Sequence, residues 1–387
     1  MRIGGDCVFE GFVFSDETSA LSDAEFAAAL GWLDQARGAI ERRAALIEEA
    51  PERAAILMPD EGWHPDSQPS FELDGATRNA QTSYELLAKG DRDIIAKMRL
   101  YGHSFTGYQL ATLELAGKRP WLAKKLPGNW DEVLGFLAGP PDQAVFDYVA
   151  VAGALPEELR AAPPRKFGEI GWLIEGAIVN DDTYAYLERL CLMHENGLID
   201  HLRERQAANG ALRIVEIGGG FGGLAFYLMR LFGEAVRYAI IDIPESLAFS
   251  SVYCATLYPG LDNRFEQAGP VPLPGAPGFS FVPNTIHSEL ADTDLPADLV
   301  INTLSLSEMS DAQIHDYCQA ASRMIGDTGI FFEQNHQTEH QGPGEIPPLY
   351  LKTLKKCESR LLTASFPSRR GDANLWVNSS YGADYGG

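Results

Sequence analysis

The chain of 387 residues is long enough for two domains, and its 45% hydrophobic and 22% charged residues are typical of a globular protein. A net charge of -23 argues against a nucleic-acid substrate, because phosphates are repelled over much of such a surface. Five scattered cysteines without a C-x-x-C pair fit reduced thiols, and the sequence shows neither a signal-peptide pattern nor an apolar run of about 20 residues. We therefore expect a soluble, cytoplasmic protein that binds neither nucleic acid nor membrane.

The first 165 residues show mainly helical patterns after a mixed segment over residues 1–14. Ser22 and Glu25 have the spacing of a capping box, at the start of a helical pattern that runs to Leu57. Residues 58–75 are rich in Pro, Gly and Asp and predict a loop. Further helices are predicted over residues 82–100, 130–137 and 143–151. We interpret residues 1–165 as a mainly helical N-terminal domain that ends near Pro163-Pro164.

The next segment, residues 166–205, is interpreted as a connection, with one long helix predicted from Asp181 to Arg205. Strand and helix patterns then alternate, which is typical of a doubly wound parallel sheet. Ser310 and Gln313 predict the capped start of the last of these helices. The predicted strands are residues 213–217, 238–241, 279–282, 298–302 and 329–333, and the predicted helices are residues 223–232, 246–257 and 311–325. Most of residues 259–283, with six prolines, is predicted to be a loop.

The C-terminal end of the predicted domain, residues 206–387, follows a different pattern. A helix is predicted over residues 348–357, and strand-like runs follow at 360–366 and 374–381. The turn Ser368-Arg369-Arg370-Gly371-Asp372 separates the two runs. Strands joined so closely must be antiparallel, so we predict a C-terminal antiparallel hairpin on the parallel sheet.

The most informative motif is a glycine-rich run, Val215-Glu216-Ile217-Gly218-Gly219-Gly220-Phe221-Gly222-Gly223. It lies between a predicted strand and a predicted helix, and Asp242 ends the next strand. Strand, glycine turn, helix, strand and acid follow one another in this order in nucleotide-binding βαβ units. Glycines let the backbone approach a ligand closely, and the acid can accept hydrogen bonds from both ribose hydroxyls.

The choice of nucleotide depends on Glu216, because the glycines satisfy both G-x-G-x-x-G and G-x-G-x-G. A pyrophosphate prefers a helix N-terminus without a nearby carboxylate. S-adenosylmethionine has no phosphate, and its ammonium and sulfonium groups are positive. We therefore predict S-adenosylmethionine as the cofactor, with a tight turn in an unrelated α/β domain as the alternative. The predicted cofactor-binding residues are Glu216, Gly218, Gly219, Gly220, Gly222, Asp242, Ile243, Asn302 and Thr303.

Ligands of doubly wound sheets lie beyond the carboxyl ends of the strands, which gives these residues separate roles. Asp242 is assigned to the ribose, with a helix-capping acid before Pro244 as the alternative. Ile243 can flank the adenine ring or simply be packed. Asn302 and Thr303, which end the fourth predicted strand, can meet the methionine or sulfonium portion.

Transfer of a methyl group from a sulfonium to a hydroxyl is an in-line displacement, in which alignment supplies much of the rate. An alcohol is a poor nucleophile, so a base near its proton helps. His287, Glu308 and His336 follow the third, fourth and fifth predicted strands and are the candidate bases. Each can equally be a loop residue in water, and the sequence does not choose between them. His315 lies inside a predicted helix and is interpreted as structural.

Two other groups are weaker candidates. His336 and His340, with Glu333 nearby, have a metal-like spacing, but they fall in a Gly/Pro loop, so no metal site is predicted. The segment Tyr101-Gly102-His103-Ser104-Phe105 with Tyr108 can line an acceptor pocket, although a packed aromatic cluster is the preferred interpretation.

The sequence resembles the sugar O-methyltransferases of antibiotic and surface-polysaccharide gene clusters, within the class I methyltransferases. The resemblance covers roughly residues 165–336. The segments that carry it are Glu216–Ala225, Ile241–Glu245, Asp298–Thr303, Ser307-Glu308-Met309, Phe167–Gly171 and Val179–Thr183. It implies a Rossmann-like α/β fold, S-adenosylmethionine as the cofactor and a hydroxyl-bearing small molecule, such as a sugar, as acceptor. It assigns no base.

The expected function is S-adenosylmethionine-dependent O-methylation of a small, hydroxyl-bearing, glycosylated metabolite. N- or C-methylation of another small molecule is the nearest alternative. An NAD-dependent oxidoreductase would need the same glycine turn, but Glu216 and the predicted hairpin argue against it. A non-catalytic scaffold would bind the cofactor without turnover. The N-terminal domain is expected to cover the acceptor site or to form a homodimer.

Overall fold

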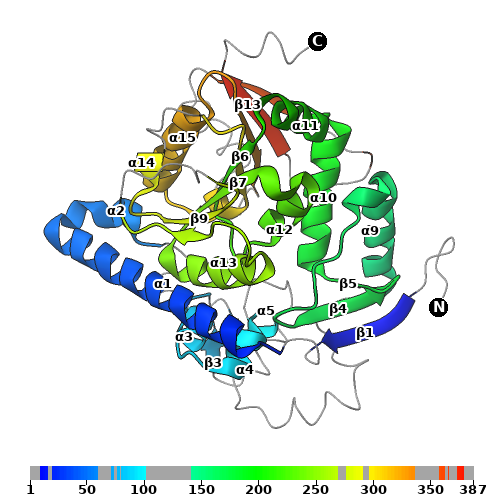
Figure 1. The fold of residues 1–387 in the computed structure, drawn as a ribbon, viewed down its shortest axis with the longest axis horizontal. Helices are drawn as coiled ribbons and strands as arrows, with labels where there is room; N and C mark the ends of the chain where they lie inside the picture. The colour runs from blue at the N-terminus through cyan, green and yellow to red at the C-terminus, as the bar shows by residue number, and fades with distance from the viewer. Residues whose placement is uncertain are drawn as a thin grey trace. The chain divides into compact units, whose positions relative to one another are not determined.

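The computed structural model describes the residues 9–15, 20–59, 71–73, 76–78, 80–101, 141–268, 276–290, 296–335, 357–361, 365 and 373–378. Two compact units divide the chain, and they do not follow its order (Figure 1). One unit, here the N-terminal unit, holds residues 1–30 and 65–191. The other, here the sheet unit, holds residues 31–64 and 192–387. The functional domains expected at 1–165, 166–205 and 206–387 stay a prediction.

The sheet unit contains an eight-stranded sheet with the strand order β12-β13-β11-β10-β6-β7-β9-β8. From β11 to β8 all neighbouring strands are parallel. Four of these strands are buried almost throughout, as is expected of parallel strands with both faces covered. The strands are β6 (Leu212–Ile217), β7 (Val236–Asp242), β8 (Arg264–Phe265), β9 (Gly278–Pro283), β10 (Leu299–Thr303), β11 (Ile330–Gln334), β12 (Cys357–Leu361) and β13 (Ala373–Asn378).

Helices cover both faces of this sheet. Helix α15 (Asp311–Ile325) packs on one face, where its apolar residues join Val215, Ala239, Val300 and Phe331 in one core. Helices α12 (Gly223–Phe232) and α13 (Pro244–Leu257) pack against β7, and α13 also contacts β9. The doubly wound sheet predicted from the alternating pattern is therefore confirmed.

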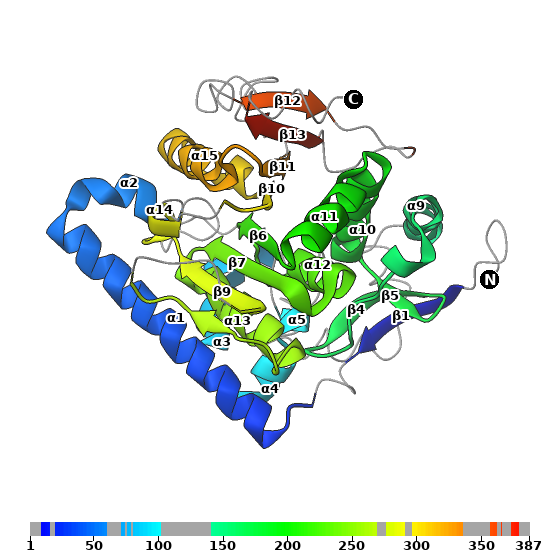
Figure 2. The ribbon, with the colours of Figure 1, turned by 45° about the horizontal axis from the view of Figure 1, so that its top comes forward.

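The predicted C-terminal hairpin is also confirmed, since β12 and β13 pair antiparallel (Figure 2). The later strand, β13, lies between β11 and β12 and is antiparallel to both. Trp376 of β13 is buried in the core beneath α15, which explains why this strand takes the inner position. The turn at 368–372 lies outside the described residues, as do residues 348–356 of the helix predicted over 348–357, whose last residue, Cys357, begins β12.

The single helix predicted from Asp181 to Arg205 is wrong. The chain forms α10 (Asp181–Glu195) and α11 (Leu198–Asn209), separated at Gly197, whose φ of 77° is left-handed. Left-handed backbone ends a helix, and glycine adopts it without steric cost. The periodic pattern of apolar residues continued across this break and concealed it.

The helices predicted in the first half of the chain are likewise shorter than their patterns. Residues 21–57 form α1 (Asp23–Glu49), a short 3-10 turn at Pro51–Arg53 and α2 (Ala54–Leu57). Residues 82–100 are divided between α3 (Ala80–Leu87), α4 (Arg92–Ala96) and α5 (Met98–Tyr101), whereas α9 (Pro141–Ala154) contains residues 143–151. Residues 130–137 lie outside the described part of the chain.

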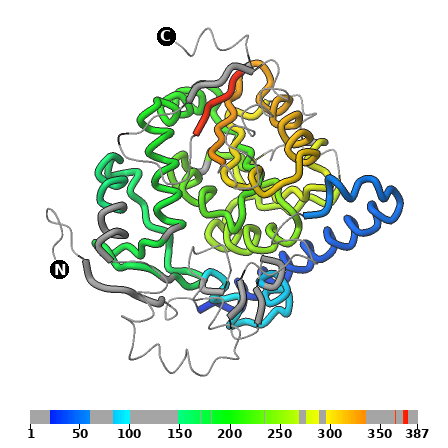
Figure 3. The backbone as a smooth tube through the Cα atoms, turned by 180° about the vertical axis from the view of Figure 1, so that it is seen from behind, coloured from blue at the N-terminus to red at the C-terminus, as the bar shows by residue number. Residues whose placement is uncertain are grey.

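Residues 31–59 pack on the sheet unit although they are far from it in sequence. Trp32 contacts Phe281 of β9 edge to face, with ring centroids 5.6 Å apart. Arg43 forms a buried bidentate ion pair with Glu245 of α13, at 3.0 and 2.5 Å. Helix α2 lies against α15 (Figure 3), where Gln313 donates to the carbonyls of Ile56 and Met58. This segment of α1 and α2 is therefore part of the sheet unit.

The N-terminal unit contains a three-stranded sheet that the sequence analysis missed. Strand β1 (Phe9–Ser15) pairs antiparallel with β4 (Glu169–Ile174), which pairs with β5 (Ala177–Val179). A two-stranded sheet, β2 (Phe71–Leu73) with β3 (Ala76–Arg78), accompanies it. The helices α3, α4, α5 and α9 also belong to this unit.

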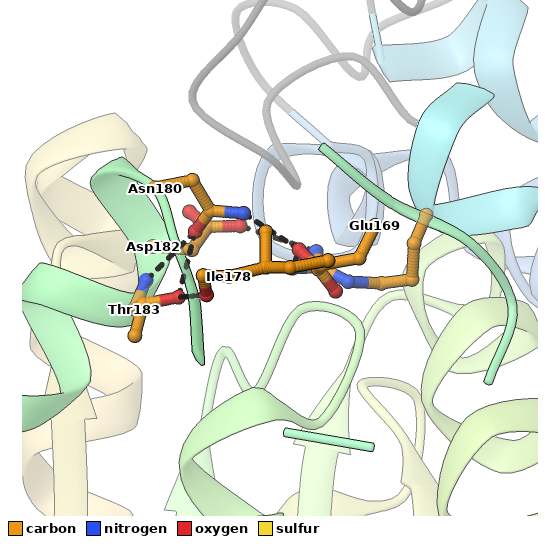
Figure 4. A network of polar contacts seen from close by, with 6 residues as sticks. Glu169, Ile178, Asn180, Asp182 and Thr183 are labelled. Carbon is orange, nitrogen blue, oxygen red and sulfur yellow. Dashed lines mark hydrogen bonds and ion pairs between the residues drawn. The ribbon is translucent and has the colours of Figure 1, made fainter. Parts of the chain in front are cut away.

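A buried polar network connects β4, β5 and α10 in this unit (Figure 4). The Glu169 carboxylate accepts hydrogen bonds from Asn180 at 2.6 Å and from Arg99 at 3.1 Å. Arg99 also pairs with Asp182 at 3.1 Å, and the Asn180 side chain accepts from Thr183. The two upstream segments that resemble the sugar O-methyltransferases, 167–171 and 179–183, thus supply partners to one network. Buried charges require such partners, so a structural role accounts for these residues.

Among the described residues, no helix is long and apolar enough to cross a membrane.

Candidate functional site

The glycine-rich turn lies between β6 and α12, at the carboxyl edge of the parallel strands. Gly218, Gly220 and Gly222 have positive φ angles of 75°, 56° and 89°. The turn is fixed to the next strand, because Gly218 N donates to the carbonyl of Ile241 at 2.8 Å. Gly222 ends the turn as the left-handed residue directly before α12. The predicted strand, turn and helix are therefore present at this position.

Packing as well as backbone conformation requires glycine here. A Cβ atom at Gly218 would lie 2.0 Å from the Ser305 hydroxyl, and one at Gly222 would lie 2.5 Å from the Cys254 sulfur. A Cβ atom at Gly219 would meet Ile240 at 2.7 Å. The sequence analysis attributed these glycines to a ligand alone, whereas neighbouring side chains already exclude a Cβ.

Asp242 connects the end of β7 to the glycine turn. Its carboxylate accepts hydrogen bonds from Gly220 N at 3.0 Å, Ile243 N at 2.8 Å and the Ser246 hydroxyl at 2.7 Å. Burial raises the pKa of Asp242 from 3.8 to about 6, although these three donors act against the increase. These contacts tie Asp242 to the start of α13, although no backbone N–H of the first turn among the described residues is capped by its side chain. The residue as a whole is partly exposed.

Glu216 is buried below the turn, with 2% of its surface exposed. The Tyr238 hydroxyl donates to its Oε2 atom at 2.8 Å, and this oxygen is 3.2 Å from the Cβ position of Gly219. The carboxylate is thus close to the glycine turn, as expected. Its contact with the ammonium of a methionine group stays a prediction.

Asn302 ends β10 and is also tied to the turn. Its side-chain amide donates to the Ile217 carbonyl at 2.9 Å and to the Ser305 hydroxyl at 2.6 Å. The next turn is strained, because Leu304 has a φ of 70°, which non-glycine residues rarely adopt. Asn302 is fully buried and Thr303 is 8% exposed. The geometry gives Asn302 a positioning role in the turn, and its contact with a cofactor stays a prediction, as does that of Thr303.

Asn284, directly after β9, was within the expected region but was not singled out. Its backbone N–H donates to the Asp242 carbonyl, and its side-chain amide donates to the carbonyl of Leu57 in α2, each at 2.9 Å. A carbonyl can only accept, so this contact fixes which end of the amide points to α2. The Oδ1 atom of Asn284 is buried and has no hydrogen-bond partner among the described residues. An unpaired buried acceptor beside Asp242 is costly unless a ligand donor meets it.

His287, the first candidate base, begins the short helix α14 (His287–Leu290) and is 4% exposed. Its Nδ1 atom is 2.7 Å from the carbonyl of Asn284, and its Nε2 atom is 2.7 Å from the Asp316 carboxylate. The ring also packs on Tyr317, with centroids 4.5 Å apart. The hydrogen bond from His287 lowers the pKa of Asp316. Because both ring nitrogens face oxygen acceptors, this geometry favours a role in holding Asn284 over that of a base.

The other two candidate bases differ in position. Glu308 ends the 3-10 turn Ser305–Glu308 and is exposed. His336 lies outside the described residues, as do His340 and the segment 102–108. His315 is exposed on α15, where its ring contacts Gln319, and its structural interpretation stays a prediction. In the described part of the chain, no group of three or more His, Cys, Asp or Glu residues could hold a metal ion.

The end of β11 carries a second polar group. The Glu333 carboxylate accepts from Asn374 of β13 at 2.7 Å and from Asn335 at 3.0 Å. Glu333 is opposite Asn302 in the β10–β11 register, so this group adjoins the residues that hold the glycine turn. Sequence analysis considered Glu333 only as a companion to two histidines, and its contact with Asn374 joins two strands that are distant in sequence.

Comparison with known proteins shows similarity of limited extent. No family model matches the chain, and no curated protein is significantly similar to it. A solved amino pentose methyltransferase from Micromonospora echinaspora is 10% identical over 48% of this chain and 91% of that one, with a TM-score of 0.32. The O-methyltransferase TomG from Streptomyces achromogenes is 16% identical over 48% and 79%, with a TM-score of 0.31. Fibrillarin from Aeropyrum pernix, with bound S-adenosyl-L-methionine, is 14% identical over 50% and 75%, with a TM-score of 0.34.

Because these sequence identities and TM-scores are low, the activities of those proteins are not assigned to this chain. The chain's own strand order and site residues define a Rossmann-like α/β protein with a C-terminal antiparallel hairpin. The polar residues that end β6, β7, β9, β10 and β11 form the candidate site.

Proposed function

We propose that the protein is an S-adenosylmethionine-dependent methyltransferase that methylates a hydroxyl group of a small molecule, such as a sugar or a glycosylated metabolite. The observation that carries the proposal is the contact between the glycine turn and Asp242, from Gly220 N to Oδ2 at 3.0 Å. It supports the proposal because a carboxylate that can accept hydrogen bonds from ribose hydroxyls lies beside the glycine turn, and a second acid, Glu216, lies beneath that turn. An amine or carbon acceptor remains the alternative within the same chemistry.

The adenine end of the cofactor is assigned to Asn284. The Leu57 carbonyl holds the amide so that Oδ1 is free to accept a hydrogen bond, and the backbone next to it is bonded to Asp242. The exocyclic amine of adenine is a donor of the kind that this buried oxygen requires. His287 and Asp316 then support the loop from below rather than take part in proton transfer.

Calorimetry with S-adenosylhomocysteine, S-inosylhomocysteine and NAD tests this proposal. S-adenosylhomocysteine should bind, whereas the inosyl compound, which presents a carbonyl to Asn284 Oδ1, should bind at least about tenfold more weakly. NAD should not bind, because its pyrophosphate would face the acid at the glycine turn. Binding of NAD alone would establish the oxidoreductase alternative. If S-adenosylhomocysteine binds but the protein transfers no methyl group from S-adenosylmethionine to any hydroxyl, amine or carbon acceptor, the non-catalytic scaffold would be favoured.

Binding of S-adenosylhomocysteine should depend on pH through Asp242. Burial raises the pKa of this carboxyl to about 6, so the protonated form predominates in the free protein below that pH. Because the pKa of Asp242 is higher in the folded protein than its ordinary value of 3.8, protonation of this carboxyl stabilises the fold. This contribution to stability is fully present below pH 3.8 and is lost as the pH rises through about 6. The ribose hydroxyls need the ionised form, so the affinity should be constant above about pH 7 and fall by about tenfold per pH unit below 6.

Titrations between pH 5 and pH 8 measure this dependence, with Asp242→Asn as the matched control. The asparagine does not ionise, so its weaker affinity should not change across the range. An affinity that falls in the same way in both proteins would assign the dependence to another group.

A further inference from the structure

Asn335 presents a second buried acceptor at the carboxyl edge of the sheet. It follows β11 and is 8% exposed, and its Nδ2 atom donates to Glu333 Oε2 at 3.0 Å. Its Oδ1 atom is buried and meets no hydrogen-bond partner within the described part of the chain. An unpaired buried oxygen of this kind is unfavourable, so its retention points to a donor that arrives with a ligand.

The orientation of this amide is fixed by chemistry. A carboxylate accepts hydrogen bonds and does not donate them, so the NH₂ group of Asn335 must face Glu333. The same holds for Asn374, whose Nδ2 atom is 2.7 Å from the other oxygen of Glu333. Both amides therefore direct their donors inward to the carboxylate, and what Asn335 offers to a ligand is an oxygen.

The position of this group differs from that of the cofactor residues. Asp242 and Asn284 follow β7 and β9, whereas Asn335 follows β11, on the other side of β6 and β10 in the sheet. Asn302 lies between the two groups, opposite Glu333 in the register and hydrogen-bonded to the carbonyl of Ile217. A ligand at Asn335 would thus be separate from the adenosine yet on the same edge.

We propose that Asn335 Oδ1, supported by Glu333, is a binding subsite for a hydroxyl or ammonium group of the methyl acceptor. Donors of this type satisfy the free oxygen, and the negative Glu333 next to it favours an ammonium and disfavours a carboxylate. The site therefore selects neutral or amino-bearing polyols over acidic ones. This inference rests on the proposed function, because the acceptor has a role only if the methyl donor binds.

Ligand-observed saturation-transfer NMR on the full chain with saturating S-adenosylhomocysteine tests the inference. The probes are D-glucosamine, D-glucose and D-glucuronate. Glucosamine and glucose should bind, with glucuronate weakest. Asn335→Leu removes the oxygen but keeps a similar side-chain volume, so it should weaken the binding of glucosamine and of glucose by about tenfold or more. Asn374→Leu removes the other donor to Glu333 but leaves Asn335 Oδ1 in place, so it should weaken both probes less.

The affinity of each variant for S-adenosylhomocysteine shows whether its sheet unit is intact, and Asn335→Ala replaces Asn335→Leu if the larger variant does not fold. Unchanged sugar binding in the Asn335 variant would overturn the subsite, as would equal losses in both asparagine variants. Glucuronate binding as tightly as glucosamine would also overturn it. If none of the three probes binds while S-adenosylhomocysteine does, the subsite fails and the proposed function stands. If S-adenosylhomocysteine itself does not bind to the wild type, both fail.

Discussion

Replacing Asp242 with alanine is expected to weaken S-adenosylhomocysteine binding by roughly 30- to 150-fold. Two ribose hydroxyls would lose a charged acceptor, which corresponds to about 2–3 kcal/mol of binding free energy. The variant also frees three donors, from Gly220, Ile243 and Ser246, so the glycine turn loses one of its links to β7. Calorimetric titration near pH 7.5 measures the change, where wild-type Asp242 is ionised because its pKa is about 6.

Two further variants separate ribose binding from the support of the turn. Asp242→Asn keeps the volume and one accepting oxygen, which can serve either Gly220 or Ile243 because the two donate to different oxygens of Asp242. It loses the charge, so its affinity should fall between those of wild type and alanine. Asp311→Ala is the matched control, because Asp311 is an exposed acid in the first turn of another helix of the sheet unit. It should bind as the wild type does. An alanine variant at 242 with wild-type affinity would leave Asp242 with only its role in holding the glycine turn to the start of α13.

Replacing Arg43 with alanine is expected to lower the free energy of unfolding by about 3–5 kcal/mol. Arg43 is 4% exposed and its guanidinium pairs with both oxygens of Glu245, which is 2% exposed. Removing one partner leaves a buried charge without compensation, which costs more than the pair itself contributes. Urea unfolding followed by tryptophan fluorescence measures the loss, since Trp32 lies on the same helix and contacts β9.

The control for this prediction lies on the same helix. Arg37 pairs with Asp34 at 2.7 Å, but the two side chains are 51% and 69% exposed, so Arg37→Ala should cost less than about 1 kcal/mol. Arg43→Met combined with Glu245→Leu should recover most of the loss, because apolar residues of similar volume need no partner. A loss in Arg43→Ala as small as that in Arg37→Ala would show that the ion pair does not hold α1 to α13.

Arg43 also has a functional consequence, since Glu245 begins the helix that follows Asp242. The charge of Glu245 contributes to the raised pKa of Asp242. The segment that carries Arg43 continues to α2, where Leu57 orients the Asn284 amide. Residues 31–59 therefore support two residues of the candidate site without themselves following a strand of the sheet.

The sequence by itself determined the fold of the sheet unit and the main elements of its site. Apolar runs of strand length that alternate with helical patterns predict a parallel sheet covered by helices, because each helix must bury its apolar face on the sheet. The same local rules placed the glycine turn, Asp242 and the capping box at Ser310, which needs only residues three apart in sequence. The helix break at Gly197 was missed because glycine is tolerated within a helical pattern, and only its φ of 77° shows the end.

Contacts distant in sequence were decided by the tertiary structure alone. Arg43 meets Glu245, Leu57 meets Asn284, and Glu333 meets Asn374 only after the chain has folded. Their side chains carry no periodic signal, because polar partners are selected by geometry at the site and not by position along a helix or strand. Burial in the folded protein also changes the chemistry of single side chains. It raises the pKa of Asp242, and it leaves the Oδ1 atoms of Asn284 and Asn335 without a hydrogen-bond partner among the described residues. A linear sequence states which groups are present, and the fold determines which of them lose water and which partners remain for a ligand.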